Sequence, residues 1–122
     1  MLKFAITPGY DRRLIEPSRL PSLRIPYANQ RQHPAHGGRV VYYLERGDGM
    51  IKIGTTANFS QRRSSLRREH GPLTLLAWEH GSYELEKGRH ALFEYERPEK
   101  SEWFEPSWFL INHIMGLRAA MA

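Results

Sequence analysis

The chain has 122 residues, no cysteine, a mean hydropathy of −0.60 and a formal net charge of +5 at pH 7. Its length suits one domain with a modest core, and the lack of cysteine excludes disulfides and thiolate metal sites, so a cytoplasmic protein is expected. No apolar run reaches the roughly 18 residues of a membrane span, and the positive charge favours nucleic acid over a membrane as partner.

Residues 1–36 are predicted to form an extended, basic, Pro-rich arm. They hold five of the eight prolines and six Lys/Arg against two Asp/Glu. Proline at this density prevents a long helix or a central strand. Two interpretations stay open: an arm that follows a phosphate backbone, or a surface wrap held by its leucines while its arginines are solvated. Residues 37–122 are predicted to form the folded domain.

Residues 40–54 are predicted to form a β-hairpin. The run VVYYL is rich in β-branched and aromatic residues, GDG supplies residues that tolerate positive φ, and MIKIG follows as a second strand. Alternation along that strand places Ile51 and Ile53 on one face and Lys52 on the other.

A helix is predicted to begin after Asn58 and to end near His70. Asn58 is a favourable N-cap, and Gln61 follows it by three residues, as in a capping box. Phe59 and Leu66 lie seven residues apart and define the buried stripe of this helix.

Two arginines interrupt that buried stripe. Arg62 and Arg63 occupy positions at which a helix of this kind usually has leucine. Breaks of a local rule are often functional, although an arginine at the edge of a core can also extend its charge into solvent. The same helix carries two more arginines, Arg67 and Arg68.

Further elements are predicted downstream. Residues 73–78 form a third strand, residues 83–95 a second helix, and a last helix opens at residues 106–107. Trp103 and Phe104 are expected in the core. The core side of the second helix is predicted to carry Leu85, Gly88, Leu92 and Tyr95, and the apolar face of the last helix Trp108, Leu110, Ile111, Ile114, Met115 and Leu117.

Polar residues share a second face of the helix predicted at 83–95. Glu86 and His90 are stacked neighbours at i and i+4, a spacing at which both can meet one ligand. The competing interpretation is a surface pair of Glu86 with Arg89, which contributes little.

In order and spacing, these motifs resemble those of the GIY-YIG nuclease superfamily. VVYYL, the following KIG, NFSQRR, ELEKGRHALF and SEWF are similar to the phage and fungal branch, which has KIG in place of YIG. The resemblance covers roughly residues 38–105. It implies an α+β fold with a small three-stranded antiparallel sheet flanked by helices, in the order β-β-α-β-α-α. It also implies a phage or mobile-element origin, and hence the cytoplasm of a bacterial or phage-infected cell.

The resemblance implies a metal-dependent DNA endonuclease with one Mg²⁺ or Mn²⁺ ion. Tyr42 falls on the first-motif tyrosine, which helps to deprotonate or orient the attacking water. Gly54 falls on the second-motif glycine and allows close approach of substrate. Arg62 falls on the catalytic arginine, which offsets charge on the phosphate oxygens. Glu86 falls on the metal-binding glutamate, and Glu84 is a weaker competitor for that role.

Two positions depart from that pattern. Lys52 replaces the second-motif tyrosine, and it is a poor general base but a good phosphate ligand. Leu66 stands where many active members have histidine or tyrosine, so His90 or Tyr43 would have to substitute.

The alternatives are therefore a catalytically impaired nucleic-acid-binding module or a protein-interaction domain on the same fold. A homodimer or a partner protein is one way to reach both strands of a duplex. Predicted DNA contacts are Gly54, Arg63, Arg67, Arg68 and Arg89.

Overall fold

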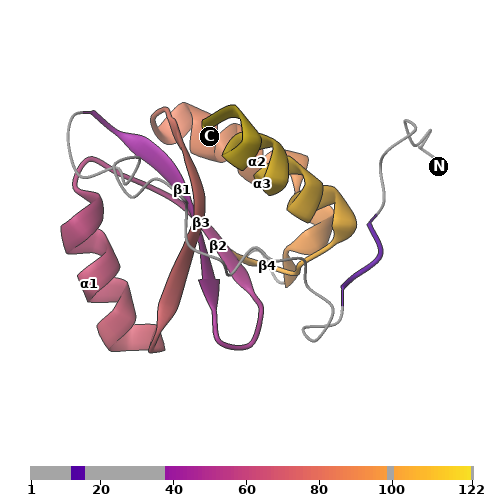
Figure 1. The fold of residues 1–122 in the computed structure, drawn as a ribbon, viewed down its shortest axis with the longest axis horizontal. Helices are drawn as coiled ribbons and strands as arrows, with labels where there is room; N and C mark the ends of the chain where they lie inside the picture. Colours follow the sequence, from indigo (N-terminus) through magenta and orange to yellow (C-terminus); the bar gives the residue numbers. More distant parts are fainter. Residues whose placement is uncertain (1–11, 16–37, 99–100, 122) are drawn as a thin grey trace.

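The computed structural model describes residues 12–15, 38–98 and 101–121 as one antiparallel sheet with helices on both of its faces (Figure 1). The strand order is β3-β1-β2-β4. The elements are β1 (Val40–Arg46), β2 (Ile51–Thr56), α1 (Phe59–His70), β3 (Leu73–His80), α2 (Tyr83–Leu92), a 3-10 turn (Glu94–Glu96), β4 (Trp103–Phe104) and α3 (Trp108–Met121).

The predicted α+β class is confirmed, with one strand more than expected among the described residues. Trp103 and Phe104 are not only core aromatics. They pair with Lys52 and Ile51 and extend the sheet as β4. A two-residue strand is too short to show a period of its own, so no sequence signal separates it from a loop.

Alternation along the strands separates two apolar layers, and Ile51 and Ile53 share one of them, as predicted for the second strand. Val41, Tyr43 and Ile53 belong to the layer covered by α2 and α3. Tyr42 and Leu44 belong to the layer on the other face, under α1. Figure 1 shows α1 on one side of the sheet and α2 with α3 on the opposite side. In the described part of the chain, no helix is both long enough and apolar enough to cross a membrane.

Local signals placed the hairpin and α1 well. Gly49 takes φ 90° in the hairpin turn, a conformation that glycine adopts without a steric cost. Asn58 caps α1, since its side-chain oxygen accepts a hydrogen bond from the backbone N–H of Gln61. Phe59 and Leu66 are the buried residues of α1, as expected.

Three predicted core positions are wrong. α2 ends at Leu92 and the chain tightens into the 3-10 turn, so Tyr95 is turned outward and is 73% exposed. Phe93 takes the buried position in its place. Gly88 on α2 and Met115 on α3 are also exposed.

The described part of the N-terminal segment lies against the domain. Leu14 forms a β-bridge with Ser107, and Ile15 is buried. The N–H of Ile15 donates to the carbonyl of Pro106 at 2.9 Å, and the N–H of Trp108 donates to the carbonyl of Arg13 at 3.0 Å. These four residues therefore act as an anchor. The other residues of the predicted arm lie outside the described ranges.

Arg12 gives this anchor an electrostatic component. Its guanidinium lies 2.6 Å from the carboxylate of Glu96, a side chain only 2% exposed. The same guanidinium lies over the rings of Phe109, at 4.4 Å, and Tyr95, at 5.0 Å. Burial raises the pKa of Glu96, an effect that Arg12 offsets only in part.

We predict that Arg12→Ala lowers the free energy of unfolding by about 2 kcal/mol at pH 7, because it leaves the Glu96 carboxylate buried without its cation. Urea denaturation of the full chain measures this loss. Arg39→Ala is the matched control, since Arg39 is exposed. Equal stability of the two variants would contradict the anchoring role of Arg12.

Candidate active site

The candidate site is built around one cross-strand pair. Tyr42 of β1 lies opposite Gly54 of β2. The phenol ring lies directly over Gly54, so closely that a Cβ atom at that position would be 2.4 Å from the Tyr42 oxygen. Arg62 of α1 reaches the same oxygen, with Nε donating at 3.4 Å. Tyr42 thus brings together residues predicted from three separate motifs, since it contacts both Gly54 and Arg62.

The protonation state of Tyr42 follows from its surroundings. The side chain is only 1% exposed, and burial raises the pKa of its phenol, although Arg62 acts in the opposite direction. The phenol is therefore protonated at neutral pH. It can orient a water molecule or a phosphate oxygen, but it is a weak proton acceptor. Of the two roles predicted for Tyr42, this environment favours orientation over deprotonation.

Lys52 lies on the same face of β2 and is also buried, at 5% exposure. Its ammonium group forms an ion pair with the carboxylate of Glu102 and lies 5.7 Å from the centre of the Trp103 ring. Burial tends to raise the pKa of Glu102, but the hydrogen bond from Lys52 and nearby positive charge lower it overall. Lys52 is thus a cation with an ionised partner.

Helix α2 brings His90 and Glu86 to this region from the other face of the sheet. The Nε2 atom of His90 lies 2.7 Å from the carbonyl oxygen of Ile53 and must donate there, because a carbonyl only accepts. The charges of His90 and Arg62 act on Glu102, and the charge of Glu86 acts on Tyr42. The predicted Tyr42, Lys52, Arg62, Glu86 and His90 are therefore within electrostatic reach of a common region.

Glu86 fits a metal-binding role of limited kind. It is half-buried, and its carboxylate makes no hydrogen bond or ion pair with the residues that the structure describes. Within those residues there is no group of three or more His, Asp and Glu that could hold a metal ion. Such a donor set fits Mg²⁺ or Mn²⁺ only where water and phosphate oxygens complete the coordination shell, which is the usual arrangement for Mg²⁺.

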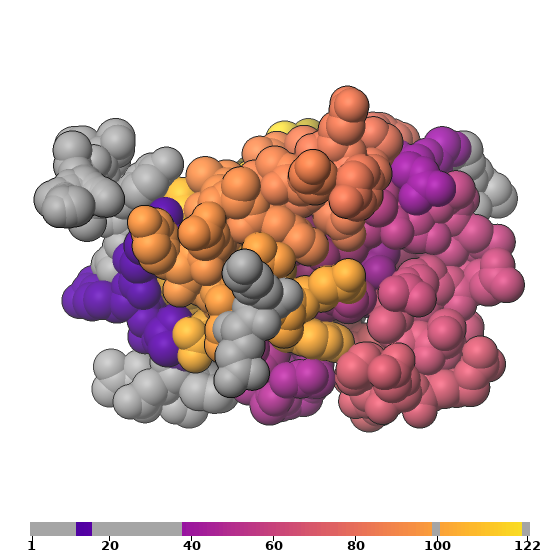
Figure 2. Space-filling model, turned by 180° about the vertical axis from the view of Figure 1, so that it is seen from behind, coloured from indigo at the N-terminus to yellow at the C-terminus, as the bar shows by residue number. Residues whose placement is uncertain are grey.

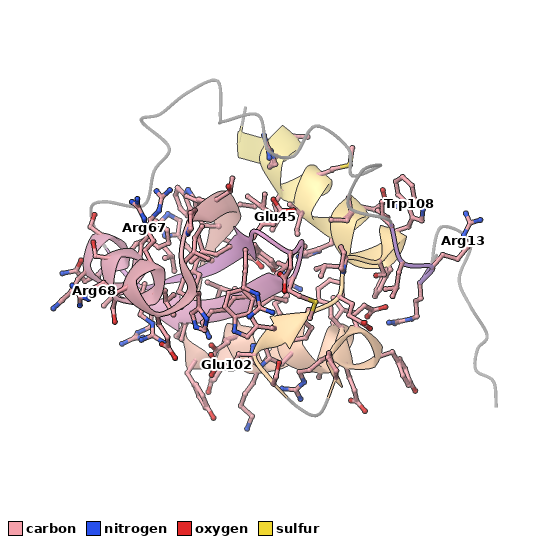
Figure 3. All side chains as sticks on the ribbon, turned by 90° about the horizontal axis from the view of Figure 1, so that it is seen from below. Arg13, Glu45, Arg67, Arg68, Glu102 and Trp108 are labelled. Carbon is pink, nitrogen blue, oxygen red and sulfur yellow. The ribbon has the colours of Figure 1, made fainter. Side chains whose placement is uncertain are left out.

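The arginines of α1 lie on different sides of that helix. Arg63 is half-buried, and its Nη2 donates to the carbonyl of Leu73 at 3.2 Å, so it ties α1 to β3. Arg67 and Arg68 are exposed and point outward from α1, away from Glu102 (Figure 3). They line a depression of about 440 Å³ together with Ser64, Gly71 and Pro72.

Arg89 belongs to a separate network on the α2–α3 face. Its guanidinium makes two hydrogen bonds to Glu79, at 2.8 and 2.9 Å. Tyr43 donates to the same carboxylate at 2.6 Å, and His113 lies 3.0 Å from the Tyr43 oxygen. Tyr43 thus points away from Tyr42, and Arg89 fastens α2 to β3. Burial tends to raise the pKa of Glu79, but the interactions of its carboxylate with His113, Arg89 and Tyr43 hold it well below its usual range.

Glu102 is the site residue that sequence reasoning missed. A carboxylate in a loop carries no periodic signal, and the motif SEWF drew attention to its aromatics. One signal was present: a lysine on a buried strand face requires a counterion. Register then identifies that counterion, because Lys52 pairs with Trp103 and the preceding residue lies beside it. Figure 2 shows α1 (pink) and α2 (orange) on the same face of the molecule.

Comparison with known families gives a match to most of the folded domain. The family model described as the T5orf172 domain matches residues 39–117, which include every site residue discussed above. No curated protein and no solved structure matches the chain.

We predict that Gly54→Ala lowers the free energy of unfolding by about 2 kcal/mol, because the added methyl group forces the Tyr42 ring from its position. Thermal or urea unfolding measures this change. Gly47→Ala is the matched control, since a Cβ there meets nothing within 4 Å and Gly47 has no positive φ. A Gly54→Ala variant as stable as Gly47→Ala would show that Tyr42 does not rest on Gly54.

Proposed function

The chain belongs to the T5orf172 domain family, and from this premise we propose that it is a metal-dependent DNA endonuclease that hydrolyses phosphodiester bonds. Membership of the family indicates a nuclease-like or DNA-binding module. The observation that carries the finer proposal is the contact of Tyr42, Gly54 and Arg62, with Lys52 and Glu86 beside it.

Arg62 is suited to neutralise a phosphate. Its side chain is exposed, yet its Nε is held by the Tyr42 oxygen, a hydrogen bond that chiefly raises the pKa of the guanidinium. Because Nε is occupied, the two terminal nitrogens remain for the phosphate oxygens. Negative charge grows on these oxygens during hydrolysis, and a guanidinium already fixed in place stabilises it without reorganisation.

Tyr42 and His90 have different roles toward the attacking water: Tyr42 positions it and His90 accepts its proton. Tyr42 accepts from Arg62 and keeps its own O–H, with which it positions the attacking water or a phosphate oxygen. His90 donates through Nε2 to the carbonyl of Ile53, so neutral His90 keeps a lone pair on Nδ1. That lone pair can accept a proton, a role that Leu66 cannot take.

Glu86 would hold the metal ion through one carboxylate. When bound, Mg²⁺ or Mn²⁺ supplies polarisation of the phosphate and stabilisation of the leaving oxygen. Arg89, one turn further along α2, is bonded to Glu79 and fixes the helix against the sheet. This fastening helps to hold α2, and with it Glu86 and His90, against the sheet that carries Tyr42.

We predict that the protein nicks supercoiled plasmid in Mg²⁺ or Mn²⁺, and that Glu86→Gln or Arg62→Gln slows nicking by about 100-fold or more, because each removes a charge that the transition state requires. Agarose gel electrophoresis of the plasmid forms measures the rate.

The control is Glu84→Gln, which removes the same charge from an exposed position in the same turn of α2. It should nick at nearly the wild-type rate. Wild-type protein that nicks no faster than Glu86→Gln in either metal would overturn the endonuclease proposal.

The second candidate is a nucleic-acid-binding module without cleavage. It is favoured by the protonated Tyr42 phenol and by a Lys52 whose charge Glu102 compensates, since neither can act as a base. In this reading Arg67 and Arg68 would hold a DNA backbone in their depression on α1.

For either candidate we predict that Arg67→Gln/Arg68→Gln reduces the slope of log affinity against log salt concentration by about one to two, since each lost phosphate contact lowers it by roughly one. Fluorescence anisotropy with a labelled duplex in EDTA measures the slope. Arg39→Gln serves as the control.

The N-terminal segment needs a variant that keeps the Arg12 anchor. The triple variant Arg19→Gln/Arg24→Gln/Arg31→Gln removes three of the six Lys/Arg of residues 1–36 without deleting residues 12–15. A lower slope of log affinity against log salt concentration supports an arm that follows the DNA backbone. An unchanged slope shows that these three arginines do not contact phosphates.

A further inference from the structure

The ion pair of Lys52 and Glu102 is unequal in exposure. Lys52 is enclosed, with 6% of its side chain exposed, whereas 54% of the Glu102 side chain is exposed. A buried ammonium group needs an anion, because its own hydration is lost. An exposed carboxylate has no matching need, since water can replace the ammonium. The ion pair therefore compensates the buried charge of Lys52, whereas Glu102 itself gains little from it.

The backbone on either side of the Glu102 side chain is fixed. The N–H of Ile53 donates to the carbonyl of Glu102 at 3.4 Å. Ser101 accepts from the N–H of Trp103 at 2.8 Å, and Trp103 pairs with β2. The carboxylate can thus leave Lys52 by side-chain rotation alone, with β4 staying on the sheet.

Several cationic or potentially cationic groups surround this one carboxylate. Lys52 contacts it through Oε1, and the charge of Arg62 also acts on it, as does that of His90 when the imidazole is protonated. Arg62 is the residue whose terminal nitrogens are suited to a phosphate. A phosphodiester carries one negative charge, as a carboxylate does, so it can replace Glu102 without a change in the local charge balance.

We propose that the Glu102 carboxylate occupies, in the DNA-free protein, the anion position between Lys52 and Arg62 that a DNA phosphate takes on binding. This proposal rests on the proposed function in taking DNA as the ligand of the same site. Glu102 then regulates the site as an internal competitor. It keeps Lys52 compensated while the site is empty and must rotate into solvent before a phosphate can enter.

The test measures binding without cleavage, by anisotropy of a labelled duplex in EDTA. Glu102→Gln should bind DNA roughly three- to tenfold more tightly than wild type, because the competitor has lost its charge. Glu94→Gln removes the same charge from an exposed residue of the 3-10 turn and should change affinity less than about twofold.

Lys52 supplies the second arm of the test. In a Lys52→Met background, Glu102→Gln should give a clearly smaller gain, since no ammonium group is released for the phosphate. Glu102→Asp keeps the charge but shortens the side chain, and it should bind DNA with an affinity between wild type and Glu102→Gln. If Glu102→Gln gives no cooperative thermal unfolding transition, the affinity of Glu102→Asp is used for the test instead.

The outcomes separate the two proposals. Binding by Glu102→Gln or Glu102→Asp that is no tighter than binding by Glu94→Gln overturns the internal competitor, and so does an equal gain with and without Lys52. If the wild type binds DNA but never cleaves it, the endonuclease proposal fails. The role of Glu102 as an internal competitor is then decided by the DNA affinities of its variants alone. If the wild type binds no DNA at low salt, both fail.

Discussion

The contact between the Tyr42 ring and Gly54 is the constraint on which the rest of the site depends. Opposite residues in an antiparallel pair bring their side chains close together, and an aromatic ring can cross the neighbouring strand only where that strand lacks a Cβ. Gly54 provides that gap. The phenol then lies under α1, where it is buried and where Arg62 reaches it. Because Gly54 has no side chain, Tyr42 can lie across β2 and contact Arg62, which connects the hairpin to α1.

Charge compensation organises the surroundings of this contact. Lys52 and Glu102 form one pair, Arg89 and Glu79 a second, and Arg12 with Glu96 a third. The latter two are structural: they fasten α2 to β3 and the N-terminal anchor to the domain. The first lies beside Arg62 and is half open to solvent, so it is the pair that a ligand can exchange. Arg62 is hydrogen-bonded to a neutral phenol, which does not compensate its positive charge, so that charge remains to interact with a substrate phosphate.

The sequence predicted the elements whose signals are local. The cap at Asn58 and the alternation of Ile51 and Ile53 each depend on near neighbours, and the structure agrees with both. It did not predict contacts that depend on three-dimensional packing. Arg63 and Arg89 were predicted as DNA contacts, and that role stays a prediction, but the sequence did not show that each has a hydrogen-bond partner on β3 in the packed sheet. Glu102 was missed for the same reason, since its partner is fifty residues away.

The central claim is that this arrangement hydrolyses DNA with a metal ion held by Glu86. The most direct measurement is electron paramagnetic resonance of Mn²⁺ titrated into the protein bound to a phosphorothioate duplex that resists cleavage. The account predicts one bound Mn²⁺ per chain, lost in Glu86→Gln and retained in Glu84→Gln. Equal Mn²⁺ binding by wild type and Glu86→Gln would contradict it.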